Sequence, residues 1–126
     1  MESDLKIGVR CVSSTRFDAR TGPPNPDGYS VWLDVELVAE QDHRQFGGEM
    51  FSVRVCDPKW LSMQVGPGRY AWGHATLVTE RWDLALVEAA IASLCAGIQC
   101  KDWPSAVVAL SRFLKVDTID MAPDGW

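Results

Sequence analysis

Residues 29–38 constrain the fold of this chain more than any other segment, because apolar and polar side chains alternate along them more regularly than elsewhere. A period of two is typical of a β-strand with one buried face. The apolar set is Tyr29, Val31, Leu33, Val35 and Leu37. The opposite set is Ser30, Trp32, Asp34, Glu36 and Val38. The segment therefore predicts a sheet with one apolar face and one acidic face.

Three other segments carry strand signals. Residues 4–13 alternate Leu5, Ile7, Val9 and Cys11 with a more polar set that ends at Val12, which predicts a first strand. Residues 51–56 alternate in the same way and should form a hairpin with residues 29–38, since Gly47-Gly48 lies just before them. Residues 74–81 are rich in β-branched side chains, which favours a fourth strand.

Helix signals follow the third strand. Pro58 has no N–H to give to a sheet ladder, but it is harmless at the first position of a short helix over residues 58–65. Asp83 is a good N-cap for a helix over about residues 83–99, and Asp102 can cap another. The apolar side chains at helical spacing are expected to be buried against the sheet: Trp82, Val87, Ile91, Leu94, Trp103, Val107 and Leu110.

These elements predict an α+β fold in a single domain over residues 1–126, with the order β-β-β-(short α)-β-α-α. The economical architecture is a four-stranded, mostly antiparallel sheet packed on two C-terminal helices. Prolines and glycines in residues 14–28 predict a flexible loop, and residues 122–126 are expected to be frayed.

Composition excludes several classes of function. A formal charge of −5 argues against nucleic-acid binding, which relies on clustered Lys and Arg. The acidic start Met1-Glu2-Ser3-Asp4 is unlike a signal peptide, so we expect a cytoplasmic protein. The apolar stretch 84–98 is too short to span a bilayer. The four cysteines include no CxxC pair, so we expect free thiols and no metal site.

The sequence offers little that resembles catalytic machinery. His43 and His74 are its only histidines, and neither has the neighbours that a general base or a metal ligand needs. Cys56 adjoins Asp57, whose charge opposes a reactive thiolate, so structural burial is the better interpretation. We therefore predict no enzymatic activity, no catalytic residue and no cofactor.

The acidic face is the candidate site. Between residues 27 and 42 the acidic side chains are not accompanied by any Lys or Arg. One interpretation is a solvated sheet face with one surface aromatic. The other is a partner-binding patch, in which carboxylates steer a basic protein and an aromatic side chain anchors it. The residues assigned to that patch are Trp32, Asp34, Glu36, Glu40 and Asp42.

Four motifs occur in an order that resembles the immunity protein 8 family of bacterial polymorphic toxin systems, over about residues 5–121. They are Phe51-Ser52-Val53-Arg54-Val55-Cys56-Asp57-Pro58-Lys59-Trp60-Leu61, Trp72-Gly73 with His74, Arg81-Trp82-Asp83, and Asp102-Trp103 leading to Leu110-Ser111-Arg112-Phe113. The resemblance implies a small cytoplasmic protein without catalysis that binds a cognate toxin domain and occludes its active surface.

Many such toxins are basic nucleases, which would suit the negative charge of this chain. The alternative is a non-catalytic α+β adaptor or regulatory protein that binds another bacterial protein, with the Ala-rich helix as a route to a homodimer. The sequence leaves the oligomeric state open. Neither interpretation calls for nucleic acid or a membrane as a partner.

Overall fold

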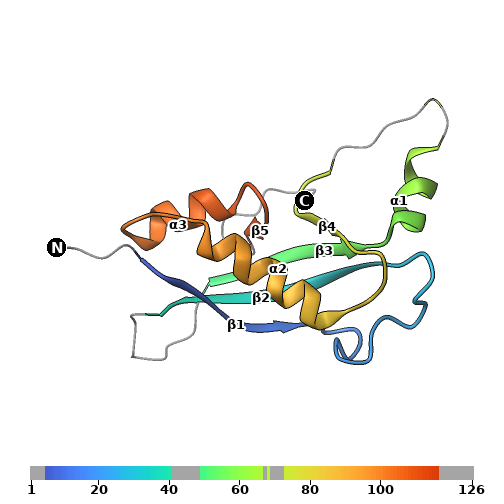
Figure 1. Cartoon of the computed structure of the whole chain (residues 1–126), viewed down its shortest axis with the longest axis horizontal. Helices are drawn as coiled ribbons and strands as arrows, with labels where there is room; N and C mark the ends of the chain where they lie inside the picture. Colours follow the sequence, from blue (N-terminus) through green and yellow to red (C-terminus); the bar gives the residue numbers. More distant parts are fainter. Residues whose placement is uncertain (1–4, 41–48, 67, 69–72, 117–126) are drawn as a thin grey trace.

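The computed structural model describes residues 5–40, 49–66, 68 and 73–116. It confirms the α+β class, with three helices, of which the last two follow most of the strands (Figure 1). The elements are β1 (Ile7–Ser13), β2 (Ser30–Ala39), β3 (Glu49–Cys56), α1 (Pro58–Val65), β4 (Thr76–Val78), α2 (Leu84–Ala96), α3 (Trp103–Leu110) and β5 (Lys115–Val116).

The sheet has five strands in the order β1-β2-β3-β4, with β5 also paired to β3. The β1–β2 and β2–β3 pairs are antiparallel, and the second of these is the hairpin that the sequence predicted. Because β2 occupies one edge of β3, both β4 and β5 use the other edge. β4 runs beside Arg54–Cys56, and β5 runs beside Phe51–Ser52. The expectation of four strands missed β5.

β4 is parallel to β3, a pairing that needs a long connection, and α1 lies in the connection between the two strands. It is also shorter than the expected strand over residues 74–81. Ala75, just before β4, has a positive φ of 53° although it is not glycine, and its carbonyl accepts a hydrogen bond from the Arg54 N–H at 2.8 Å. This unusual backbone conformation sets where the ladder begins.

β1 does not alternate as the sequence suggested. The register with β2 shifts between Val9 and Cys11, so Arg10 is an extra residue in a β-bulge. Beyond the bulge the faces are exchanged: Val12 is buried opposite Val35, and Cys11 is exposed. The prediction that Cys11 lies on the same face as Leu5, Ile7 and Val9 was therefore wrong. A strict period of two does not account for an inserted residue.

The hydrophobic core lies between one face of the sheet and the helices α2 and α3, which lie over that face (Figure 1). Of the expected helical core, Val87, Ile91 and Leu110 are buried. The other four are partly buried and pack against this core: Trp82, Leu94, Trp103 and Val107. Two small side chains that the stripe did not include, Cys95 and Ala106, are also buried.

Each helix begins at an aspartate whose side chain accepts a hydrogen bond from the backbone. Asp57 accepts from Trp60 N at 2.8 Å, Asp83 from Leu86 N at 3.2 Å and Asp102 from Ser105 N at 2.8 Å. These bonds satisfy N–H groups that have no partner within the first turn. They confirm the predicted caps Asp83 and Asp102, and add Asp57.

The proline-rich loop over residues 14–28 is attached to the fold through Trp82. The Trp82 Nε1–H donates to the Ala19 carbonyl at 2.9 Å, and the indole makes edge-to-face contacts with Phe17 and Tyr29. The predicted flexibility of this loop stays a prediction, and the predicted fraying of residues 122–126 lies outside the described residues. No helix among the described residues has the length and apolar character needed to cross a membrane.

Candidate binding surface

The face of the sheet opposite α2 is called the outer face. The cross-strand register places three rows of side chains on it. One row runs Trp32–Arg54–Thr76, the next Ser13–Asp34–Ser52–Lys115, and the third Cys11–Glu36–Met50. Its large apolar side chains reach solvent: the exposed fractions are 44% for Trp32, 37% for Met50 and 45% for Val78. An exposed aromatic amid polar groups is typical of a contact surface.

The sequence-predicted site residues are only partly gathered on this face. Trp32, Asp34 and Glu36 lie on it as β2 alternates, with Trp32 exposed and the two acids half-buried. Glu40 follows β2 and lies over Gly8, where a Cβ would come 3.0 Å from Glu40 Cγ. Asp42 lies outside the described residues. The structure thus brings three of the five together and places Glu40 beyond the end of their strand.

Trp32 lies among cations. The guanidinium carbon of Arg54 lies 4.9 Å from the centre of the Trp32 ring and 5.1 Å from the centre of the Trp60 ring. The Lys115 ammonium lies 5.7 Å from the Trp32 centre. Separations below about 6 Å allow cation–π attraction. β3, α1 and β5 therefore each contribute a side chain to an aromatic and cationic cluster around Trp32.

A cation also accompanies the acidic residues. Arg10, the extra residue of the β1 bulge, forms an ion pair with Glu36 at 3.7 Å. The outer face is therefore of mixed charge, unlike the purely acidic face that residues 29–38 suggested. The pattern of residues 29–38 alone did not reveal these cations, because the cations belong to neighbouring strands. A signal was present for Arg54, since residues 51–56 put it on the polar side of its strand.

A hollow of about 370 Å³ adjoins Trp32 and Asp34. Its other wall is the start of the proline-rich loop, including Arg16 and Phe17, together with Pro24. A concave region beside an exposed indole can accept a protruding side chain from another protein. The outer face thus offers an aromatic anchor, charges of both signs and a depression within one area.

Asp57 connects this loop to α1. Besides capping the helix, its carboxylate accepts a hydrogen bond from Gly28 N at 2.8 Å. Burial raises the pKa of Asp57, but hydrogen bonds from the backbone N–H groups, with that of Trp60 foremost, outweigh burial and hold the pKa below its usual value. The ionised carboxylate therefore fixes Trp60, and with it one side of the Arg54 cluster, relative to the loop.

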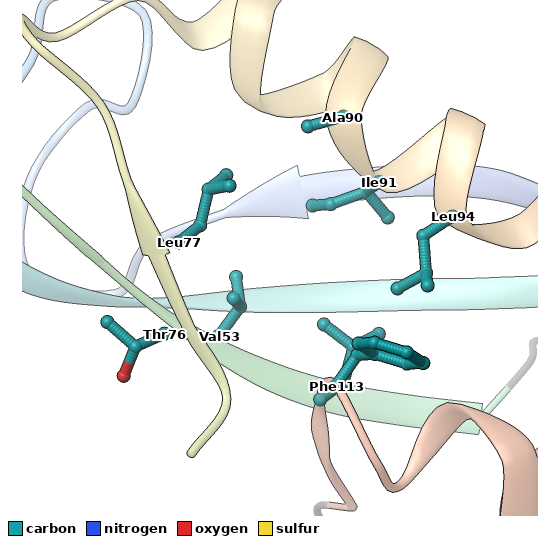
Figure 2. A pocket seen from close by; sticks show the side chains of 8 residues that line it. Val53, Thr76, Leu77, Ala90, Ile91, Leu94 and Phe113 are labelled. Carbon is teal, nitrogen blue, oxygen red and sulfur yellow. The ribbon is translucent and has the colours of Figure 1, made fainter. Parts of the chain in front are cut away.

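A second hollow, of about 200 Å³, lies on the helix side of the sheet. Figure 2 shows Leu77, Ile91 and Leu94 around it, with the Phe113 ring at one side and Thr76 pointing away. Its lining is apolar apart from Thr76. Phe113 is 53% exposed, so the hollow opens to solvent beside α3.

The candidate chemical groups have structural roles. Cys56 and Cys95 are buried, and burial raises the pKa of both thiols, that of Cys95 to about 11. The Nε2–H of His74 donates to the Ser111 carbonyl at 2.9 Å, which connects the approach to β4 with the end of α3. His43 lies outside the described residues. Within the described part of the chain, no cluster of three or more metal-ligating side chains occurs.

A family profile described as Immunity protein 8 matches residues 8–117, which run from the second residue of β1 to just past β5 and include all three helices of the described structure. The chain belongs to the immunity protein 8 family. The match confirms the resemblance carried by the four motifs, and membership identifies an immunity protein against a bacterial toxin. No curated protein and no solved structure matches this family member.

Proposed function

We propose that this immunity protein neutralises its cognate toxin by binding the toxin domain with the outer face and covering the toxin's active surface. The observation that carries the proposal is the exposed Trp32, which stands beside half-buried carboxylates and a hollow on one sheet face. Interfaces draw most of their binding energy from a few such aromatic and charged side chains at the centre of a patch.

The electrostatics support a toxin with a predominantly basic surface, such as a nuclease. The chain carries a formal charge of −5, and complementary charge speeds the encounter of two proteins. The protein acts in the cytoplasm in this proposal, where a toxin that enters a sister cell must be intercepted. It acts by occupying a surface and not by modifying the toxin, so catalysis is not needed.

Co-expression tests the proposal. The gene directly upstream is first examined for a C-terminal toxin domain. A domain found there is expressed in cells with and without the immunity protein, and its activity is measured with increasing amounts of the purified protein. We expect protected growth and complete inhibition at one equivalent. Protection should be lost in a Trp32→Ala variant whose circular dichroism matches that of the wild type. Full protection by that variant would exclude the outer face as the main contact.

The adaptor alternative gives a different result in the same experiment. An adaptor would bind another bacterial protein and would leave the toxin active at any ratio. A Trp32→Ala variant that lost binding to another protein, while toxin activity stayed unaffected by the wild type, would favour that alternative.

A further inference from the structure

Arg54 occupies an unusual environment at the centre of the outer face. Its side chain is half-buried, and its guanidinium lies over the rings of both Trp32 and Trp60. Its backbone N–H is bonded to the Ala75 carbonyl, so β3 and the approach to β4 fix the base of the side chain. The two indoles then restrict its tip. The charge is held in one position before any partner arrives.

This restrained cation has no carboxylate partner in the described part of the chain. Among the described residues, the buried Nε–H of Arg54 has no hydrogen-bond acceptor. By contrast, Arg10 pairs with Glu36, Arg20 with Asp18 and Lys59 with Asp27. A buried donor without an acceptor destabilises a fold, so such groups are uncommon without a functional reason.

A carboxylate is the group that best complements the terminal NH2 groups of this guanidinium, which, unlike its Nε–H, are not among the buried donors without an acceptor in the described part of the chain. The guanidinium presents its N–H groups in a planar fork, which matches the two oxygens of a carboxylate. Such charge-assisted pairs are stronger and more directional than neutral hydrogen bonds. The neighbouring indoles exclude water from the guanidinium faces, which strengthens an ion pair formed at its edge. The Lys115 ammonium beside Trp32 adds positive charge on the same side.

We propose that Arg54, framed by Trp32 and Trp60, is the receptor for a single carboxylate side chain of the toxin. The inference rests on the proposed function and deepens it by naming the chemistry of the central contact. The toxin surface would then carry one acidic residue at its centre with basic residues around it. Those basic residues would face Asp34 and Glu36, on the next rows of the outer face.

Calorimetry with the toxin domain used in the co-expression experiment tests the receptor. Arg54→Met keeps an unbranched side chain against the indoles but removes the charge and the donors. We expect its Kd to rise at least ~30-fold, because the toxin carboxylate would be buried without a partner. Arg54→Lys retains a charge without the fork and should bind with intermediate affinity. Arg112→Met, at an exposed arginine after α3, is the matched control and should bind like the wild type.

A charge exchange identifies the toxin residue. Each exposed Asp and Glu of the toxin domain is changed to Arg, and binding to Arg54→Glu is measured. One of these changes should restore binding to within about tenfold of the wild-type pair, as expected when a coupled pair is reversed together.

Every outcome separates the two claims. If the wild type fails to bind the toxin domain, the proposed function is overturned and the receptor with it. If the wild type binds and Arg54→Met binds equally well, only the receptor is overturned. If Arg54→Met binds weakly but no toxin variant rescues Arg54→Glu, Arg54 contacts something other than a carboxylate. If circular dichroism shows that Arg54→Met does not fold, the Arg54→Lys variant decides the question. Binding of the toxin domain by Arg54→Lys with wild-type affinity would exclude recognition of a carboxylate by the planar guanidinium.

Discussion

Gly22 lies directly against the indole of Trp82: a Cβ at Gly22 would come 2.9 Å from Trp82 Cδ1. Gly22 also has a φ of +96°, a conformation that L-residues adopt with strain. The same indole donates to the Ala19 carbonyl. A single aromatic side chain at the start of α2 thus holds the proline-rich loop that forms one wall of the hollow beside Trp32.

Gly22→Ala should therefore destabilise the fold through both strain and overlap. Gly68→Ala is the matched control, because Gly68 has a φ of +72° but no atom of the described residues lies within 4 Å of the position that a Cβ would take there. We expect about 1–2 kcal/mol from strain alone at Gly68, and a further 1–3 kcal/mol or so from overlap at Gly22. Urea unfolding measures both. Equal losses would mean that Trp82 moves aside at no cost.

Core substitutions should separate fully buried from partly buried leucines. Leu110→Ala should lower the free energy of unfolding by about 2–5 kcal/mol, since the side chain is completely buried. Leu94→Ala should cost less, because Leu94 is partly exposed and lines an open hollow. Val108→Ala, at a side chain that is 63% exposed, should change stability by less than about 0.5 kcal/mol. A larger loss for Leu94 than for Leu110 would contradict the described core.

Asp57 predicts a specific dependence of stability on pH. Its pKa in the folded protein lies below the ordinary value of 3.8. The ionised carboxylate therefore stabilises the fold fully above about pH 3.8, and this contribution is lost as the pH falls through the lower folded-state pKa.

In Asp57→Asn the cap geometry remains but the charge is gone. The wild type should be more stable than the variant at neutral pH, and the difference should shrink as the pH falls below about 4. Urea unfolding at a series of pH values measures it. A difference that stayed constant with pH would show that the charge of Asp57 plays no part.

His74→Ala should leave toxin neutralisation intact. The side chain is exposed and donates one hydrogen bond to the Ser111 carbonyl, so its loss should cost about 0.5–1.5 kcal/mol of stability. The protection assay and thermal unfolding together check this. His43→Ala is expected to behave in the same way in the protection assay. Loss of protection by a stably folded variant of either histidine would assign it a direct role.

The carboxylates of the outer face should act mainly on the association rate. Asp34→Asn combined with Glu36→Gln should slow binding of the toxin domain several-fold at low salt and much less at high salt, because salt screens steering charges. Glu88→Gln, at an exposed acid on α2, is the control. If the association rate at low salt is unchanged, these two acids have only structural roles, such as the ion pair of Glu36 with Arg10.

Local sequence patterns predicted the features that depend on neighbouring residues. The helix starts at Asp83 and Asp102 follow from capping chemistry, and α1 has the predicted bounds because Pro58 can only begin a helix there. The motifs behind the family resemblance include these aspartates. Part of the resemblance to the family was therefore carried by residues that start the helices of this chain.

Features set by distant residues were not predictable in this way. The bulge at Arg10 depends on pairing with β2, and β5 is too short to show any periodicity. The parallel direction of β4 follows from the path of the chain through α1. At the candidate site, Trp32 was found from its own strand, whereas its contacts with Arg54, Trp60 and Lys115 needed the sheet register.

During synthesis of the chain, the two edges of β3 become paired at different times. β2 can pair with β3 as soon as the hairpin leaves the ribosome, but the other edge waits for β4 and then for β5, much later in the chain. Until Val116 reaches Phe51, the nascent protein presents an open strand edge that can pair with other chains. The edge beside Phe51 and Ser52 therefore stays unpaired while residues 57–114 are synthesised, which is the interval in which pairing with other chains would compete with folding.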